Sequence, residues 1–449
     1  MKANLKKIFG GNYGIWLILL GLFMYSILAV YSASVQLPGT DTTRHLFKHA
    51  AGLLGAGICI YIVHRIPCIY FRKVSSIFYV LSIVLLIVTW LFAPEVNGAK
   101  RWLMIGPISL QTSDIAKVAL IMFLANKLSK KDGEINSLKD FAKLVLLPIG
   151  LTCLLIMPSN LSTALLVFFE ALVLVFFSSV NRKYFWSFVG ISVLAGGLLF
   201  ATILYGNITI WRFPTWKARV ESWVAGDKSD SDQVQVNNAR VAVASGGLIG
   251  RGPGNGHAKI KLANAHCDYI FANIVEEVGI IFSAFLIWLY IMLFARAISI
   301  VNKINKLEPE EALKPKYKFR QYLVLGLTSM IVIQAFSNMA VSTDLMPVTG
   351  QTLPFVSYGT SSLVFIGFAM GVILSVSREV DKDTEKIAAE TEADSEVKLV
   401  DGKIDQMSEE ANNDVAVDDN SVDSPVENVE MDNEIIEEND LNIEENERK

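Results

Sequence analysis

The sequence predicts an all-α polytopic membrane protein: ten transmembrane helices, with a large extracytoplasmic loop between helices 7 and 8. Of the 449 residues, 52% are hydrophobic and only 19% are charged, so the chain is more apolar than a soluble protein of this length. The apolar residues form long runs, and a helix needs about 20 such residues to cross a bilayer. Basic residues also recur in alternate loops between these runs.

Ten stretches are long and apolar enough to form membrane-spanning helices. Their expected limits are 13–35, 46–65, 72–93, 112–129, 141–158, 161–180, 184–205, 268–295, 321–343 and 356–377. The first stretch follows Lys2, Lys6 and Lys7, and no small-residue cleavage pattern comes after it. It is therefore expected to remain in the protein as a signal anchor.

Lysine and arginine in the short loops predict the orientation, because such residues accumulate on the cytoplasmic side. The loops expected to be cytoplasmic contain Arg65, Arg72, Lys73, Lys127, Lys130, Lys131, Lys139, Arg182, Lys183, Arg296, Lys303, Lys306, Lys314, Lys316, Lys318 and Arg320. Both termini are then cytoplasmic, and the largest outer segment covers residues 206–267.

Charge divides the chain into three parts. Residues 1–12 form a cytoplasmic N-terminus, and residues 13–378 form the ten-helix domain. Residues 379–449 contain 26 acidic and 6 basic side chains, whereas the first 378 residues contain 18 acidic and 34 basic ones. The last part has almost no aromatic residues and no apolar run, so we expect a disordered acidic cytoplasmic tail.

The outer segment 206–267 is far longer than an ordinary connection, and long loops are often functional. Its basic residues are Arg212, Lys217, Arg219, Arg240, Arg251, Lys259 and Lys261. The stretch "GRGPGNG" at 250–256 is either a flexible loop or part of an outward-facing site whose backbone amides bind a lipid-linked diphosphate. A nucleotide site is excluded, since neither a GK[ST] motif nor a βαβ unit accompanies it.

Charged side chains within the apolar stretches are candidates for function, because they usually face a protein interior or a water-filled cavity. Asp114 and Lys117 are three residues apart, so both lie on one helix face and are able to pair. Asp114 alternatively caps its helix, and Lys117 alternatively extends its ammonium group toward the membrane surface. Glu170, near the bilayer midplane, is either a protonated structural group or part of a polar path.

Asp268, in "NAHCDYIFANIVEEVG", precedes the eighth apolar stretch. It is either a helix cap or a catalytic carboxylate at the outer surface. Helical periodicity places Glu276 about 80° around the helix from Asp268 and Glu277 on the opposite side, so at least one of the two faces a neighbouring helix. The segment joining the last two stretches contains Ser357 among prolines and glycines, and it forms either a re-entrant turn or the wall of a polar groove.

Three segments resemble signatures of the shape, elongation, division and sporulation family, the FtsW and RodA group. They are "AKRWLMIGPISLQTSDIAK" at 99–117, "GGLIGRGPGNG" and "ANAHCDYIFANIVEEVG" within 246–279, and "PVTGQTLPFVSYGTSSL" at 347–363. The resemblance implies a peptidoglycan glycosyltransferase that polymerises lipid II at the outer face of the bacterial inner membrane. Undecaprenyl-diphosphate-linked glycan would be the donor.

The resemblance also implies roles for individual residues. Asp268 matches the catalytic aspartate, expected to act as a general base. Arg101, Lys117, Arg219 and Gln235 match recurrent polar positions of the family, and Asp114 stands where the family usually has glutamate. Together with the residues singled out above, the expected substrate-binding set is Arg101, Lys117, Arg219, Gln235, Gly252, Gly254 and Ser357, and the expected supporting set is Asp114, Glu276 and Glu277. "MPSNLST" at 157–163 departs from the family pattern "QPDLGT", which puts in doubt any role for that loop.

The implied partners are a class B penicillin-binding protein transpeptidase and other proteins of the divisome or elongasome, with no nucleic acid. No cofactor is firmly expected; a divalent cation, Mg²⁺ or Mn²⁺, would offset charge on the leaving diphosphate, through ligands that the sequence does not identify. The acidic cytoplasmic tail favours a role in septal division. Two other functions stay open: a lipid II flippase or transporter, and a noncatalytic division scaffold that uses the tail.

Overall fold

The computed structural model is almost entirely helical. It describes residues 9–34, 42–95, 98–106, 108–133, 135, 137–206, 213–218, 231–256, 268–307 and 311–415. The chain divides into two compact units, Met1–Ile387 and Ala388–Lys449. The first unit contains the helical bundle, and the described part of the second is the end of the last helix.

Each predicted stretch overlaps a helix of the structure. The bounds are α2 Tyr13–Ser34, α3 Thr42–Arg65, α4 Cys68–Phe92, α5 Thr112–Lys130, α8 Leu161–Phe177, α9 Arg182–Tyr205, α13 Ile270–Asn305, α14 Lys314–Ser342 and α15 Thr360–Val415. The fifth stretch is a composite of α6 Leu138–Phe141, the π-helical η1 Ala142–Leu146 and α7 Leu147–Ile156. Pro148 near the start of α7 has no N–H to donate, and the π turns directly precede it.

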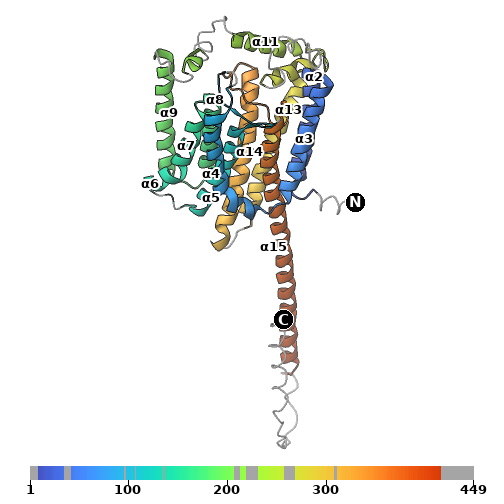
Figure 1. Cartoon of the computed structure of the whole chain (residues 1–449). Coiled ribbons are helices and arrows are strands. Elements are labelled where there is room, and N and C mark those ends of the chain that lie inside the picture. Colours follow the sequence, from blue (N-terminus) through green and yellow to red (C-terminus); the bar gives the residue numbers. More distant parts are fainter. Residues whose placement is uncertain are drawn as a thin grey trace, which may run out of the picture. The chain divides into compact units, whose positions relative to one another are not determined.

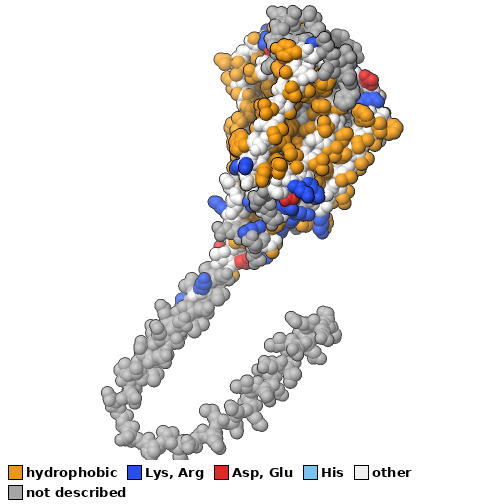
Figure 2. All heavy atoms as spheres, turned by 90° about the vertical axis from the view of Figure 1, so that its left-hand side faces the viewer, with side chains coloured by type: hydrophobic (Ala, Val, Ile, Leu, Met, Phe, Trp, Pro, Cys, Tyr) orange, Lys and Arg blue, Asp and Glu red, His pale blue; other side chains and the backbone are white. Residues whose placement is uncertain are grey.

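Seven helices within the described residues are long and apolar enough to cross a membrane, namely α2, α3, α4, α9, α13, α14 and α15. The shorter α8 is also apolar. Large hydrophobic side chains cover the face of the bundle drawn in Figure 2, and most of the visible Lys and Arg side chains lie at its lower border. A hydrophobic belt bordered by basic groups is what a multi-pass membrane protein presents to lipid.

The helices differ strongly in how far they are enclosed. The most apolar window of α14 is 78% buried by other parts of the chain, against 6% for that of α9, which lies at the edge of the bundle (Figure 1). α14 therefore forms the centre of the fold. A further helix, α11 Ser231–Gly246, lies across the end of the bundle at which α13 begins (Figure 1).

Two features differ from the predictions. A β-hairpin pairs β1 Trp102–Ile105 with β2 Ile108–Gln111, so the described chain is not purely helical. The turn of this hairpin starts at Gly106, where φ is 60°, a backbone conformation that glycine adopts easily. The disordered tail expected from residue 379 is instead helical to Val415, in a segment rich in the helix formers Glu, Lys and Ala; residues 416–449 lie outside the described residues.

A candidate polar site at the start of α13

Asp268 lies at the start of α13, on the end of the bundle that α11 crosses. It is partly exposed. The N-cap residue is Tyr269, whose side chain makes no capping hydrogen bond, so Asp268 lies one residue before the cap position. Beneath it, Tyr269 packs with Ala239 and Ala242 of α11 and with Val341 of α14. The backbone at Asp268 is thus held against two other helices.

Asn338 of α14 fixes the backbone at this point. Its side-chain amide donates to the carbonyl of Asp268 at 3.0 Å and to the carbonyl of Gln351 at 2.7 Å. Asn338 is 1% exposed. One buried amide therefore joins the start of α13 to the segment between α14 and α15, and it sets the position from which the Asp268 side chain leaves the backbone.

Asp114 and Lys117 form the ion pair that their spacing predicts. The Lys117 ammonium lies 3.1 Å from the Asp114 carboxylate, and both side chains are less than 10% exposed. Lys117 also donates to Gln334 at 2.8 Å and to Gln351 at 3.4 Å. The ammonium group therefore points into the protein, and the alternative in which Lys117 extends to the membrane surface is wrong for this structure.

The side-chain amide of Gln351 continues the network by donating to Thr163 of α8 at 2.7 Å. Asn160 caps this helix by accepting from the backbone N–H of Thr163 at 3.3 Å. Arg101 reaches the same region, since its Nε donates to the carbonyl of Ser159 at 2.9 Å. The structure thus brings Arg101, Lys117 and the backbone of Asp268 to one end of the bundle through a shared set of buried contacts.

The "GRGPGNG" loop binds a carboxylate of its own chain. The backbone amides of Gly254 and Gly256 donate to the Glu277 carboxylate at 3.0 and 3.3 Å. Ser32 of α2 donates to the same carboxylate. These amides have the anion-binding arrangement that the glycines suggest, but the anion they bind in this structure is Glu277.

The same loop completes a break in α13 at Gly279, where φ is 81°. The carbonyls of Glu276 and Glu277 accept from the amides of Arg251 and Gly252 at 3.0 and 2.8 Å. In return, the amides of Ile280 and Ile281 donate to the carbonyls of Gly247 and Leu248 at 3.0 and 3.3 Å. Four hydrogen bonds to residues 247–252, which lead into and begin this loop, thus replace helical ones, as a buried backbone requires.

The remaining candidate residues are more dispersed. Glu276 lies 3.8 Å from the Arg251 guanidinium and accepts from Ser245. Ser357 is buried and accepts from the amide of Leu353 at 2.8 Å, so it closes a turn. Gln235 is half-buried on α11. Arg219 lies outside the described residues.

Four residues of this network were not predicted, namely Thr163, Gln334, Asn338 and Gln351. Gln334 and Asn338 are four residues apart in the largely apolar second half of α14, which places them on one face. This spacing could have identified Gln334 and Asn338 as a polar pair from the sequence. Within the described residues, no three His, Cys, Asp or Glu side chains form a group that would hold a metal ion.

The sequence matches a known family over most of its length. The family model for FtsW, RodA and SpoVE, described as "Cell cycle protein", matches residues 13–382. The chain is 30% identical to the probable peptidoglycan glycosyltransferase FtsW of Coxiella burnetii, covering 84% of this chain and 99% of that one. It is also 30% identical to the protein of the same name from Geobacter metallireducens, covering 84% and 97%.

Solved structures share the fold. One is described as "Structural coordination of polymerization and crosslinking by a peptidoglycan synthase complex", with a TM-score of 0.66, 24% identity and coverage of 82% of this chain and 98% of that one. The rod shape determining protein RodA of Thermus thermophilus aligns with a TM-score of 0.59, 22% identity and coverage of 82% and 97%. At these identities, the likeness concerns the fold.

Proposed function

The chain belongs to the FtsW, RodA and SpoVE family, a group of multi-pass membrane proteins, and we propose that it is a peptidoglycan glycosyltransferase that polymerises lipid II. The observation that carries this proposal is the match over residues 13–382, which includes all of the apolar helices and the segment around Asp268. Relatives named probable peptidoglycan glycosyltransferase FtsW align over nearly their whole length.

The proposed topology has ten membrane-spanning helices, with both termini cytoplasmic and the chain in the bacterial inner membrane. The helices α2 to α5, the composite α6 to α7, α8, α9, α13, α14 and α15 are the ten spans. Segment 206–267 is then the large outer loop, and Asp268 lies at the outer surface. The basic residues at the opposite end of the bundle support this orientation.

The proposed reaction transfers a growing glycan from undecaprenyl diphosphate to lipid II. The GlcNAc 4-hydroxyl of lipid II attacks the anomeric carbon of the donor's terminal MurNAc, a new glycosidic bond forms with inversion, and the bond to the diphosphate breaks. A hydroxyl is a weak nucleophile, so the Asp268 carboxylate accepts its proton as general base. The diphosphate leaves with the electron pair of the broken bond.

Positive charge stabilises the leaving diphosphate. Arg101 is partly exposed near the buried network and supplies one guanidinium group, and Arg219 of the outer loop supplies another. Lys117 is already paired with Asp114, so its contribution is to hold Gln351 and Gln334, which line the same region. A divalent cation, Mg²⁺ or Mn²⁺, would supply the same kind of charge stabilisation.

The proposed partner is a class B penicillin-binding protein transpeptidase that crosslinks the new strands during septal cell-wall synthesis. One solved structure with the same fold concerns the coordination of polymerization and crosslinking by a peptidoglycan synthase complex, which supports such a partner. Septal rather than side-wall synthesis is favoured because the relatives named above are FtsW proteins. Depletion of the protein should then give filaments, whereas rounded cells would indicate side-wall elongation.

A lipid II flippase is the second candidate, and Glu170 of α8 favours it. Glu170 is 1% exposed, and neither carboxylate oxygen has a hydrogen-bond partner among the described residues. Such groups often mark transport paths in membranes. The full chain, reconstituted with its transpeptidase and labelled lipid II, distinguishes the functions: glycan strands indicate the polymerase, transbilayer movement alone a flippase, and neither product a scaffold.

Substitution Asp268→Asn tests the general base directly. We expect the yield of glycan strands to fall by about 10²- to 10⁴-fold, the usual contribution of general base catalysis. The control is Asp344→Asn, because Asp344 is a carboxylate at the same end of the bundle that pairs with Arg240. Near wild-type turnover of Asp268→Asn, with normal membrane insertion, would rule out the proposed role.

A further inference from the structure

An open cavity of about 1120 Å³ lies at the end of the bundle opposite Asp268. Its walls come from the segment before α2, the first turns of α2, the last residue of α3, and parts of α13 and α15. α13 begins beside Asp268, and Arg296 lines the cavity 26 residues after the start of this helix. At about 1.5 Å per helical residue, this separation corresponds to about 39 Å. The cavity is therefore separate from the proposed catalytic site.

The cavity is strongly basic. Five cationic side chains line it, namely Arg65, Arg296, Lys303, Arg378 and Lys382, against the two carboxylates of Asp381 and Glu385. Lys303 is neutralised by Asp381 at 2.8 Å. The other four cationic groups form no ion pair with a described carboxylate, so the cavity keeps a positive charge that favours an anion.

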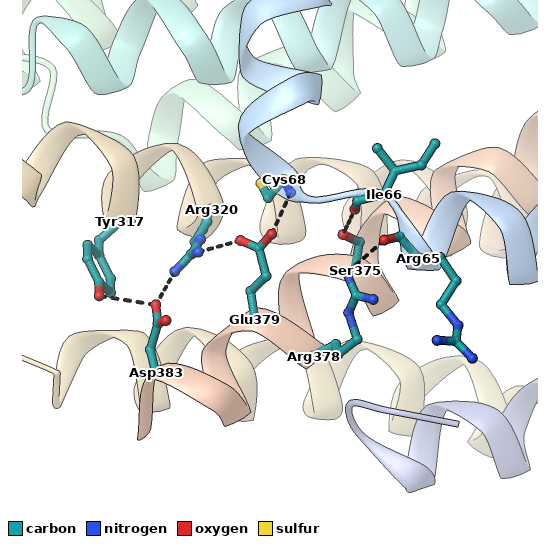
Figure 3. Close-up of polar contacts among 9 residues, drawn as sticks. All are labelled: Arg65, Ile66, Cys68, Tyr317, Arg320, Ser375, Arg378, Glu379 and Asp383. Carbon is teal, nitrogen blue, oxygen red and sulfur yellow. Dashed lines mark hydrogen bonds and ion pairs between the residues drawn. The ribbon is translucent and has the colours of Figure 1, made fainter. Parts of the chain in front are cut away.

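Arg378 is held so that its guanidinium lies beside Arg65. Its Nη2 donates to the Arg65 carbonyl at 3.0 Å, while its buried Nε has no hydrogen-bond partner among the described residues. Figure 3 shows the Arg378 guanidinium next to the Arg65 carbonyl, whereas the Arg65 guanidinium lies farther away and donates to the Tyr61 hydroxyl at 2.9 Å. Neither guanidinium group forms an ion pair with a described carboxylate, so both add positive charge to the cavity.

The segment before α2 shapes the cavity through two glycines. Gly11 has a φ of 96°, and a Cβ there would lie 3.1 Å from the amide of Arg378. A Cβ at Gly14 would lie 2.7 Å from Nε of Arg296. The segment is also fixed to α15, since the amide of Asn12 donates to Ser377 at 2.9 Å. These contacts bring the start of α2 close to Arg296 and Arg378.

The position of the cavity points to a lipid rather than a soluble anion. α2 begins at Tyr13 and α3 ends at Arg65, so the cavity lies where the apolar spans end. Tyr13 and Leu17 of α2 line it on the membrane side. Arginine matches the geometry of phosphate oxygens, and basic pockets between membrane helices at the cytoplasmic surface bind anionic head groups.

We propose that this cavity binds the phosphodiester head group of an anionic phospholipid and thereby holds α2, α3, α13 and α15 together at the basic end of the bundle. The lipid's acyl chains lie along the apolar outer face of α2, where Leu17 and Leu20 are exposed. This inference depends on membrane insertion and is independent of the proposed glycosyl transfer.

The test uses the full chain in nanodiscs of phosphatidylcholine, with phosphatidylglycerol added in steps. Retained lipid is counted by native mass spectrometry, and the midpoint of thermal unfolding is recorded. The cavity variant is Arg296→Gln with Lys382→Gln; both side chains are exposed and form no ion pair with a described carboxylate, so folding should be preserved. We expect its affinity for phosphatidylglycerol to fall about 30-fold, since each basic group near an anionic surface contributes about a factor of five.

A charge-matched control separates a site from general attraction. Lys130→Gln with Lys183→Gln removes two exposed positive charges outside the cavity, and it should leave the affinity nearly unchanged. Equal losses in both double variants, or no preference for phosphatidylglycerol over phosphatidylcholine, would overturn the proposal. Inorganic phosphate that stabilises the protein as well as the lipid does would overturn the lipid assignment. If the cavity variant unfolds, Lys382→Gln alone should lower the affinity about fivefold.

Discussion

The two ends of α14 are held by different kinds of polar contact. Near its start, Arg320 pairs with Glu379 and Asp383 of α15, and Tyr317 also donates to Asp383 (Figure 3). Near its end, Gln334 and Asn338 join a network of neutral amides with one ion pair, between Lys117 and Asp114. Charge dominates the first end, and hydrogen bonds to backbone carbonyls dominate the second.

This difference matches what each end has to do. The carboxylates of Glu379 and Asp383 are 17% and 28% exposed, so water and Arg320 share their stabilisation. The groups around Lys117 are almost wholly buried, so each depends on its protein partner. The Arg320 cluster joins helices, whereas the Asn338 network also fixes the backbone beneath Asp268. The first end should therefore tolerate substitution better than the second.

Lys117→Met should cause the largest loss of stability. It removes the only ion-pair partner of the buried Asp114 carboxylate among the described residues and withdraws a donor from Gln334 and Gln351. Removing one partner of a buried pair costs about 3–5 kcal/mol. Thermal unfolding of the purified protein in detergent measures this loss.

The control for Lys117→Met is the double variant with Asp114→Asn. The double variant has no buried, unpaired carboxylate at position 114, so it should be more stable than Lys117→Met alone. If the effects of the two substitutions simply add, the ion pair does not couple the two side chains and the contrast between the ends of α14 is lost.

Gly250→Ala should disturb the Asp268 end through the backbone. Gly250 has a φ of 83°, and its Cβ would lie 2.3 Å from the carbonyl oxygen of Glu277. Gly247→Ala is the matched control, since its φ is 57° but a Cβ there meets nothing within 4 Å. The control should lose about 1–2 kcal/mol, and Gly250→Ala clearly more, in the same unfolding assay. Equal losses of stability in the two variants would show that the loop backbone can shift to accommodate a Cβ near the break in α13.

Arg320→Gln should have a smaller effect than Lys117→Met. The carboxylates it leaves are partly hydrated, so a loss of about 1.5–3 kcal/mol is expected, typical of hydrogen bonds to charged groups. Lys303→Gln removes an exposed ion pair at the same end and should cost at most about 1 kcal/mol. Glycosyl transfer should be unchanged in both below their unfolding temperatures. An Arg320→Gln loss as large as that of Lys117→Met would contradict the comparison.

The sequence predicted the helices well because long apolar runs have few other solutions in a membrane. It also predicted the pair of Asp114 and Lys117, because residues three apart on one helix meet whatever the rest of the fold does. The pairing of Glu277 with the amides of Gly254 and Gly256 was not predictable. It depends on a break at Gly279 and on a loop more than twenty residues earlier, and neither leaves a periodic signal.

Asn338→Leu should act on turnover more specifically than the substitutions above. Leucine has a similar volume and cannot donate, so the carbonyls of Asp268 and Gln351 each lose the hydrogen bond from the Asn338 amide. If Asn338 positions Asp268, kcat for lipid II polymerisation should fall about 10-fold while KM changes little, because a small displacement of a general base weakens proton transfer. Ser337→Ala is the control, since the buried Ser337 hydroxyl has no hydrogen-bond partner among the described residues, and it should keep wild-type turnover. A fall in KM and kcat together, or the same loss in both variants, would assign Asn338 to packing alone.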